Sequence, residues 1–319
     1  MGSASTSITG AALPGAPARP AIVSAAPRRR WFEHLMGAVL LMCAVVSVLT
    51  TIGIVGVLAF ESVQFFGKVS PWEFFTGTAW APHAEPARFG IWPLFTGTFL
   101  VAFGSAIIAI PMGLGAAIYL SEYASPLTRD FVKPLLEILA GIPSVVFGYL
   151  AIVFVSPLVR DIFPRADVFN ALNASIVVAI MILPMIVSLS EDVLRSVPRS
   201  LREGAYALGA TKLDVTAGVI VPAALSGIMA SFLLAIARAV GETMAVTLAA
   251  GKRPQLTFNP LDSIQTMTAY IVETTKGDTP RDTIEYQTIF AVGLTLFLTT
   301  LALNVMAQWI LRRMREQYE

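Results

Sequence analysis

The sequence has few of the residues on which catalytic and metal centres are usually built. Its 319 residues include one cysteine, Cys43, and two histidines, His34 and His83. A single cysteine excludes an internal disulfide and a thiolate metal site. No Walker A, HExxH or CxxC sequence occurs either. We therefore expect no catalytic residue, no bound metal, no cofactor and no nucleotide hydrolysis on this chain.

Charged residues are also scarce. Asp, Glu, Lys and Arg make up 13% of the chain and hydrophobic residues 55%, whereas a soluble domain has about 25% charged residues. The mean hydropathy is +0.72. The net charge of +1 gives no electrostatic basis for binding nucleic acid. This composition predicts an all-α membrane protein that crosses the bilayer several times and is surrounded by lipid.

The sequence contains several long runs of apolar residues. A helix needs about 20 apolar residues to cross the hydrocarbon core of a bilayer. We expect one transmembrane helix in each of six runs: 36–60, 93–119, 135–157, 170–190, about 217–250 and 286–311. The run at 217–250 is too long for one straight span, so part of it must tilt, bend or protrude. We also expect a surface helix within 262–275.

The first apolar run allows a second interpretation, as the core of a cleaved signal peptide. Its 25 uncharged residues exceed a typical signal-peptide core of about 7–15 residues, and no small-x-small cleavage site follows. We therefore assign a first transmembrane helix to residues 31–61, after a disordered cytoplasmic tail at 1–30 that is rich in Ala, Pro and Ser. An outward loop at 62–92, a main transmembrane domain at 93–311 and a cytoplasmic C-terminus at 312–319 follow.

Lysine and arginine residues predict which side of the membrane each loop faces, because cytoplasmic loops carry more of them. With the N-terminus inside, 13 of the 22 lysines and arginines lie on the cytoplasmic side and 8 on the outer side. The basic clusters at 28–30 and 312–315 agree with this choice. We expect both termini in the cytoplasm, as an even number of spans requires.

One polar stretch between the fourth and fifth apolar runs has an unusual pattern. It reads 199-RSLREGAYALGATKLDVTAGVIVPAALSG-227. As a helix, it places Leu201, Ala205 and Leu208 on one face and charged residues on the others. Gly209 is expected to end or kink this helix. By spacing alone, the stretch is an amphipathic loop helix at the membrane surface.

The same stretch resembles the EAA signature of ABC importer permeases: Glu-Ala-Ala, three residues, Gly, nine residues, then Ile-x-Leu-Pro. The residues at these positions here are Glu203, Gly204, Ala205, Gly209 and, at the end of 219-VIVP-222, Pro222. Gly204 stands for the signature alanine, Val219 for isoleucine and Val221 for leucine. The resemblance implies an all-α fold with six transmembrane helices, that of type I (MetI-like) importer permeases. It also implies that residues 199–212 form a coupling helix, which docks on a separate ATPase subunit.

Three further runs resemble the permeases of phosphate-specific ABC importers: 140-AGIPSVVFGYLAI-152, 172-LNASIVVAIMILP-184 and 236-IARAVGETMAV-246. The leading span and the long loop at 62–92 resemble the PstC-type permeases, and the resemblance covers about residues 30–319. It implies transport of inorganic phosphate across the bacterial cytoplasmic membrane. The implied partners are a companion permease in a heterodimer, a cytoplasmic ATPase dimer and an extracytoplasmic phosphate-binding protein.

Two charges, Arg238 and Glu242, interrupt the apolar stretch 234-LAIARAVGETMAVTLAAG-251. Because they are four residues apart, we expect them on one helix face. Pro222 lies 16 residues before Arg238, or about 24 Å along a helix, which predicts Arg238 in the outer half of the membrane. A charge at the bilayer centre costs about 2.5–3.5 kcal/mol, so such residues usually face protein or a water-filled cavity.

Two interpretations of this pair stay open. In the first, Arg238 and Glu242 form an internal ion pair that holds helices together. In the second, they line the path of an oxyanion, because a guanidinium offers a planar fork of donors suited to it. The carboxylate would then compete for the arginine and help the anion to leave, or take up a proton if its surroundings raise its pKa. The resemblance to phosphate permeases favours the second interpretation.

Three other functions fit parts of the sequence. An ABC permease for sulfate or molybdate would use the same oxyanion chemistry. A proton-coupled secondary transporter would carry its proton on Glu242, but such transporters often contain inverted repeats, and none is recognisable here. In a membrane scaffold that transports nothing, the polar pair would be structural.

Overall fold

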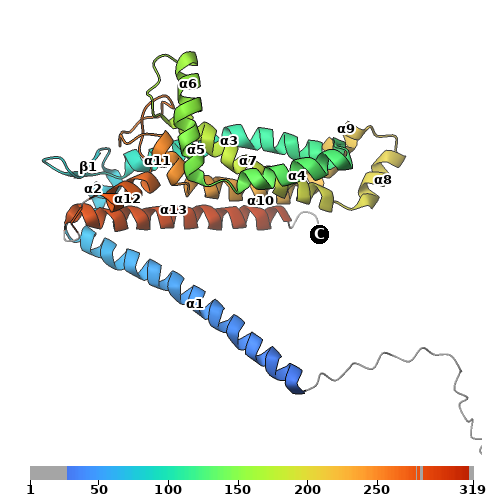
Figure 1. The fold of residues 1–319 in the computed structure, drawn as a ribbon, viewed down its shortest axis with the longest axis horizontal. Helices are drawn as coiled ribbons and strands as arrows, with labels where there is room; N and C mark the ends of the chain where they lie inside the picture. Colours follow the sequence, from blue (N-terminus) through green and yellow to red (C-terminus); the bar gives the residue numbers. More distant parts are fainter. Residues whose placement is uncertain (1–26, 278, 281–282, 316–319) are drawn as a thin grey trace, which may run out of the picture. The chain divides into compact units, whose positions relative to one another are not determined.

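The computed structural model describes residues 27–277, 279–280 and 283–315 (Figure 1). These residues are almost entirely helical, with one short pair of strands among them. The all-α prediction is therefore confirmed. Most of the predicted tail at 1–30, and the last four residues of the predicted C-terminus at 312–319, lie outside the described residues. The chain divides into two compact units, residues 1–54 and residues 55–319.

The helices and strands are joined mostly by short loops. In chain order these are α1 (Pro27–Phe66), α2 (Pro71–Thr76), β1 (Trp80–Ala81), β2 (Arg88–Phe89), α3 (Trp92–Ile118), the π-helical turn η1 (Tyr119–Tyr123), α4 (Pro126–Ala140), α5 (Ser144–Leu150), the π-helical turn η2 (Ala151–Val155), α6 (Ser156–Ile162), α7 (Ala171–Ser196), α8 (Arg199–Ala207), α9 (Lys212–Val215), the π-helical turn η3 (Thr216–Ile220), α10 (Val221–Val240), α11 (Met244–Ala249), α12 (Met267–Lys276) and α13 (Ile284–Arg315). The two strands pair antiparallel, with Trp80 opposite Phe89.

Six helical segments in the described part of the chain are long and apolar enough to cross a membrane. They are Trp31–Phe66, Trp92–Tyr123, Ser144–Ile162, Ala171–Ser196, Lys212–Val240 and Ile284–Arg313. This confirms the predicted number of spans. The third span begins later than expected and the fifth ends earlier, and both differences have a local cause in the chain.

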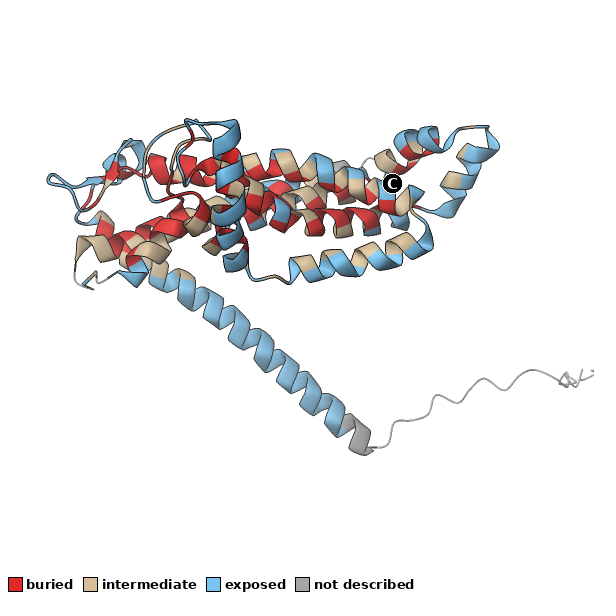
Figure 2. Cartoon of the chain, turned by 45° about the horizontal axis from the view of Figure 1, so that its top comes forward, coloured by how far each residue is buried: buried red, intermediate tan, exposed pale blue. Residues whose placement is uncertain are grey.

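The first unit contains the N-terminal part of α1. Every residue from Trp31 to Ile54 is exposed in this chain, and most are apolar (Figure 2). A helix that is apolar on all sides is suited to lipid or to the apolar surface of another protein. The helix continues to Phe66, beyond the predicted end at residue 61, because Glu61 and Ser62 do not break it.

The core of the second unit is built around α3 and α7, with α10 packed beside them (Figure 2). Glycines allow these helices to approach closely. A Cβ atom on Gly104 would lie 2.5 Å from the Ser175 hydroxyl oxygen, and one on Gly113 would lie 2.6 Å from a methyl carbon of Ile186. Close approach through small residues is how helices associate in lipid, where no hydrophobic effect drives them together.

Prolines explain two of the π-helical turns. Pro157 follows η2 and Pro222 follows η3. A proline has no N–H to donate, and its ring clashes with the carbonyl group four residues earlier. In both cases that carbonyl, of Val153 or Gly218, lies inside the π-helical turn. The wider turn shifts the hydrogen-bond register, so that each helix continues past its proline.

The third span does not follow the prediction of one helix over 135–157. Gly141–Pro143 separates α4 from α5, and Pro143 is the residue before the first turn of α5. A proline disfavours helical backbone at the residue before it, which breaks the helix at this point. Helix α4 is amphipathic and lies along α7, with Val132 and Leu136 packed against the core. The span therefore begins at Ser144.

Aromatic side chains hold together the end of the second unit that we call the loop end, formed by residues 67–91 and 251–277. Phe65 packs edge-on against Phe74, Phe74 against Trp80, and Trp80 against Tyr270, with ring centroids 5.0–6.2 Å apart. The outward loop predicted at 62–92 thus contains α2 and the two strands. The helix predicted within 262–275 is present as α12, Met267–Lys276, but it is not simply a surface helix, because its first four residues and Thr274 are buried.

Candidate functional site

The residues predicted to act in function lie in different parts of the second unit (Figure 1). One end carries the segment that we call the elbow, residues 199–215, which contains α8 and α9. The loop end lies opposite the elbow. Glu242 belongs near the loop end, because its backbone carbonyl oxygen accepts a hydrogen bond of 2.8 Å from the hydroxyl group of Thr268, in the first turn of α12. Helix α10 connects the two regions.

Gly209 determines the shape of the elbow. Helix α8 ends at Ala207, and Gly209 follows with a φ of +84°. This left-handed conformation is open to glycine at little cost and is common just after a helix. The prediction that Gly209 ends the helix is confirmed. The coupling helix expected over 199–212 is in fact two helices, because Thr211 starts α9 with a capping box that it shares with Asp214.

The other signature residues take different positions around the elbow. Glu203 and Gly204 are exposed on α8, and a Cβ atom added to Gly204 would have no atom within 4 Å. Ala205 packs against the core. Pro222 lies at the start of α10, directly after the π-helical turn η3 that lets the helix continue past it. The signature therefore exposes the acidic side chain of Glu203 and packs the small side chain of Ala205 against the core.

Large apolar side chains project from the elbow. Leu208 is 91% exposed and Leu213 is 68% exposed. Tyr206 and Leu201 are also exposed. A cluster of exposed apolar side chains within a few residues of one another indicates a contact surface for another protein or for the membrane.

The inward side of the elbow is fixed by an ion pair between Arg202 and Glu122. Arg202 Nη1 donates to both carboxylate oxygens of Glu122, at 2.8 and 2.7 Å. Arg202 Nη2 donates to the backbone carbonyl of Leu194 at 2.7 Å. One side chain therefore ties α8 to η1 at the end of α3 and to the last turn of α7.

A second ionic cluster lies beside the first. The carboxylate of Glu191 is buried on α7 and is shared by Arg129 at 2.8 Å, Lys133 at 2.9 Å and Arg195 at 3.6 Å. Lys133 also binds Asp192 at 2.6 Å. The hydrogen bond to Asp192, with the further support of Glu191, raises the pKa of Lys133 above its ordinary value of 10.5. Lys133 is therefore charged at any physiological pH, and it holds α4 against α7.

Arg238 and Glu242 do not share one helix face, and that prediction was wrong. Helix α10 ends at Val240, and Gly241 begins a turn that leads to α11. Glu242 lies in this turn, where its Oε1 accepts a hydrogen bond of 3.2 Å from the backbone N–H of Ala245 in α11. The predicted bend in the long run 217–250 is thus confirmed, and it falls between the two charges.

The side chain of Arg238 is exposed in this single chain, and that of Glu242 is partly exposed. Within the described residues, Arg238 has neither an ion pair nor a hydrogen bond from its side chain, so the internal ion pair with Glu242 is not formed. Leu234, Arg238 and Gly241 form an exposed stripe at helical spacing. Since an arginine facing lipid is costly, this stripe is expected to face protein or water.

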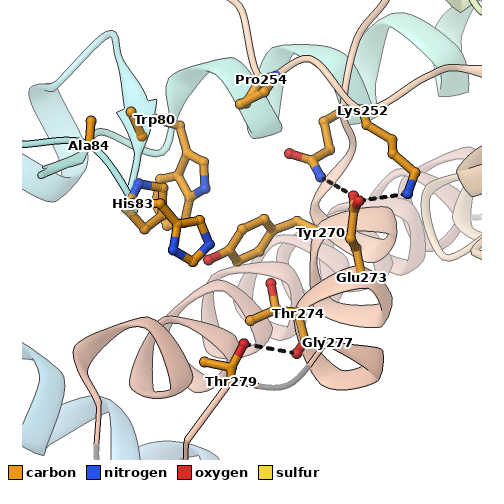
Figure 3. A pocket seen from close by; sticks show the side chains of 13 residues that line it. Trp80, His83, Ala84, Lys252, Pro254, Tyr270, Glu273, Thr274, Gly277 and Thr279 are labelled. Atoms are coloured by element: carbon orange, nitrogen blue, oxygen red, sulfur yellow. Dashed lines mark hydrogen bonds and ion pairs between the residues drawn. The ribbon is translucent and has the colours of Figure 1, made fainter.

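The loop end holds a cavity of about 430 Å³ that the sequence did not reveal (Figure 3). Its walls include Trp80, His83 and Tyr270, and its polar centre is Glu273. Glu273 forms an ion pair with Lys252 at 2.7 Å and accepts a hydrogen bond from the side-chain amide of Gln265 at 2.8 Å. Burial raises the pKa of Tyr270 above 10.0, so its hydroxyl group stays protonated. The cavity depends on contacts between segments far apart in sequence, so no local pattern predicts it.

Metal-binding residues do not gather in the part of the chain that the structure describes. No group of three or more His, Cys, Asp or Glu side chains there is arranged to hold a metal ion.

Comparisons with known proteins identify the family. Residues 109–316 match the family described as binding-protein-dependent transport system inner membrane component. The chain belongs to this family of permeases. This permease is 33% identical to a probable ABC transporter permease protein, YqgH, from Bacillus subtilis strain 168, over 92% of its own length and 95% of the relative's.

The permease is also similar to phosphate transport proteins. It is 32% identical to the phosphate transport system permease protein PstC of Mesorhizobium japonicum, over 85% of its own length and 87% of the relative's. It is 31% identical to the phosphate transport system permease protein PstC of Haemophilus influenzae, over 81% of its own length and 85% of the relative's. The predicted resemblance to PstC-type permeases is confirmed.

Solved structures share the fold of the permease. A chain of a bacterial alginate ABC transporter, in complex with an alginate pentasaccharide-bound periplasmic protein, aligns with a TM-score of 0.61 at 14% identity, over 90% of the permease and 96% of that chain. A chain of the MetNI methionine ABC transporter in an inward-facing conformation aligns with a TM-score of 0.52 at 19% identity, over 70% and 94%. These likenesses confirm the MetI-like fold. The six apolar helices and the family match indicate a multi-pass membrane protein.

Proposed function

We propose that this permease moves inorganic phosphate into the cell as one membrane subunit of an ATP-driven importer. The observation that carries the choice of cargo is its similarity to phosphate transport permeases along most of its length. Arg238 supports an anionic cargo, because its guanidinium is exposed beside a break in a span and has no partner within the described residues. Guanidinium groups bind phosphate oxygens with paired, charge-assisted hydrogen bonds.

The partners follow from the surfaces that the chain leaves open. The elbow, with Leu208 and Leu213 projecting, docks on a cytoplasmic ATPase dimer, which binds and hydrolyses ATP. The loop end receives an extracytoplasmic phosphate-binding protein. The exposed stripe around Arg238 faces a companion permease, so that the two membrane subunits enclose the path in a heterodimer. Both termini are then cytoplasmic, in the cytoplasmic membrane of a bacterium.

The mechanism assigns different tasks to the two charges. Arg238 meets the anion as it sheds water in the outer half of the membrane. Glu242 lines the same path from the turn that follows α10, and its carboxylate also caps α11 through Ala245. The Glu242 side chain moves together with this turn, because its carboxylate is bound to Ala245. When the turn moves the carboxylate closer to the bound anion, their electrostatic repulsion increases and the anion is released more easily. Glu203, Gly204, Ala205, Gly209 and Pro222 transmit the motion of the ATPase.

The proposal is tested first by purification and then by transport. Expressed with the ATPase, companion permease and binding protein that its source organism supplies, the chain is expected to co-purify with the ATPase. In proteoliposomes, uptake of radiolabelled phosphate should require ATP, stop with vanadate and resist a tenfold excess of sulfate or molybdate. Uptake driven by a proton gradient without ATP would indicate a secondary transporter. ATP-dependent uptake of radiolabelled sulfate or molybdate, with no ATP-dependent uptake of radiolabelled phosphate, would overturn the choice of cargo.

A further inference from the structure

A basic cavity lies beside the elbow, away from Arg238 and the loop end. Its volume is about 510 Å³. It lies between the start of α4, the last turn of α7 and the start of α8. Four arginines and one carboxylate supply its charged walls: Arg129, Arg195, Arg199, Arg202 and Asp130. Four guanidinium groups around one space are an unusual arrangement in a chain with only 13% charged residues.

The carboxylates near this cavity do not use all of its positive charge. Arg202 is occupied by Glu122 and by a backbone carbonyl. Arg129, Lys133 and Arg195 share the carboxylate of Glu191, and Lys133 also binds Asp192, so three cations meet two carboxylates. In the described part of the chain, the exposed side chain of Arg199 has no acidic partner. Guanidinium donors of Arg195 and Arg199 therefore remain free at the wall of the cavity.

The backbone adds a favourable field to these side chains. The first residues of α4 and α8, Pro126 and Arg199, both line the cavity. The N-terminus of a helix carries a partial positive charge and unpaired N–H groups. Helix α8 begins without a side-chain cap, so its first N–H groups are available to another acceptor. Helix α4 offers fewer such groups, because Pro126 has no N–H and the Ser125 side chain accepts the N–H of Thr128. The start of α8 and the free guanidinium donors of Arg195 and Arg199 thus point to the same ligand chemistry, that of an oxyanion.

We propose that this cavity binds a phosphate group, supplied either by the headgroup of an anionic phospholipid or by free inorganic phosphate. The fork of a guanidinium matches two oxygens of a phosphate, and basic pockets between transmembrane helices recognise anionic headgroups in this way. A bound phosphate bridges α4, α7 and α8, and so ties the elbow to the helices of the core. The site is independent of the cargo, because it lies at the elbow and not at Arg238.

The test compares two variants that remove the same number of charges. Arg195→Gln with Arg199→Gln removes the free donors, while Arg129 and Lys133 still neutralise Glu191 and Arg202 still binds Glu122. The matched control, Arg160→Gln with Arg165→Gln, removes two exposed arginines outside the cavity. The single variant Arg199→Gln breaks no ion pair and serves if the double variant fails to assemble. Each variant is purified as the complex with its ATPase, and co-elution of the ATPase verifies assembly.

Two measurements distinguish the sources of the phosphate group. In the lipid arm, complexes from nanodiscs that contain phosphatidylcholine and phosphatidylglycerol are analysed by native mass spectrometry for retained phosphatidylglycerol. In the free-ion arm, complexes in phosphatidylcholine alone are dialysed against radiolabelled inorganic phosphate without the binding protein. The double variant is expected to lose binding by about tenfold or more in one arm, since each charge-assisted contact contributes about one decade of affinity. The control should match the wild type.

The outcome assigns the source or rejects the site. A loss confined to phosphatidylglycerol identifies a lipid headgroup, and a loss confined to inorganic phosphate identifies the free ion. If the double variant, the single variant and the control all bind as the wild type does in both arms, the cavity holds no phosphate group and the proposal is overturned.

Discussion

The guanidinium of Arg202 donates hydrogen bonds of 2.8 and 2.7 Å to the two carboxylate oxygens of Glu122, across 80 positions of sequence. The side chains are only 19% and 6% exposed. Arg202 directly precedes the signature residue Glu203, so this ion pair connects the elbow to a segment that continues a membrane-spanning helix. We expect a push received by α8 to reach the end of α3 through this pair.

The pair predicts a coupled effect in a double-mutant cycle. Arg202→Gln leaves Glu122 without its cation, which costs about 2 kcal/mol. Glu122→Gln should cost a similar amount, and the double variant less than the sum of the two, because the partners are already uncoupled. The measurement is the thermal midpoint of the purified complex, together with the amount of phosphate moved per ATP hydrolysed. Arg160→Gln is the control, and losses that simply add would contradict a direct pair.

Gly204 lies within α8 and Gly209 lies just after its end, so the effects of substituting the two glycines can be compared. Gly209→Ala places a Cβ atom in a left-handed conformation and should cost about 1–2 kcal/mol. Gly209→Asn should cost less, because asparagine tolerates this conformation. Gly204→Ala meets no atom and improves helix propensity, with a gain of about 0.5–1 kcal/mol.

Transport per ATP hydrolysed and thermal stability should fall in the order Gly204→Ala, Gly209→Asn, Gly209→Ala. The steric environment is open at both glycines, so any difference between the two alanine variants reports backbone conformation. Equal behaviour of the two alanine variants would remove Gly209 from the account of the elbow.

Leu208 is predicted to be a main contact with the ATPase. Full burial of a leucine side chain contributes about 1.5–3 kcal/mol, so Leu208→Asp should weaken binding of the ATPase by about tenfold or more. Phe258→Asp is the matched control, because Phe258 is 78% exposed at the loop end. Affinity is measured by titrating the labelled ATPase into the permease in nanodiscs. Unchanged affinity of the Leu208 variant would mean that the elbow docks through other residues.

The sequence predicted those features that depend on local chemistry. Apolar runs identified the six spans, and the position of Gly209 after a short helix predicted the end of α8, because only the local backbone decides both. The π-helical turn before Pro222 was not anticipated. It depends on how the released carbonyl groups find new donors, which composition alone does not determine.

The sequence predictions that failed, or that could not be made, concern contacts that no local sequence pattern reveals. Arg238 and Glu242 fit helical spacing, yet Gly241 and the capping of α11 by Glu242 end the helix between them. A glycine within an apolar run can continue a helix or end it, and here the hydrogen bond from Ala245 favours the end. The ion pair of Arg202 with Glu122 joins segments far apart in sequence, so it was invisible before the fold was known.

The most direct test of the central claim, that Arg238 meets the transported anion, is ATP-driven uptake of radiolabelled phosphate into proteoliposomes that contain the Arg238→Gln variant. We expect uptake to fall by more than about tenfold, since one guanidinium contact with a phosphate is lost, while the complex with the ATPase still assembles. Arg238→Lys, which keeps the charge but not the planar fork, should give an intermediate rate. Phosphate uptake at the wild-type rate in Arg238→Gln would contradict the account.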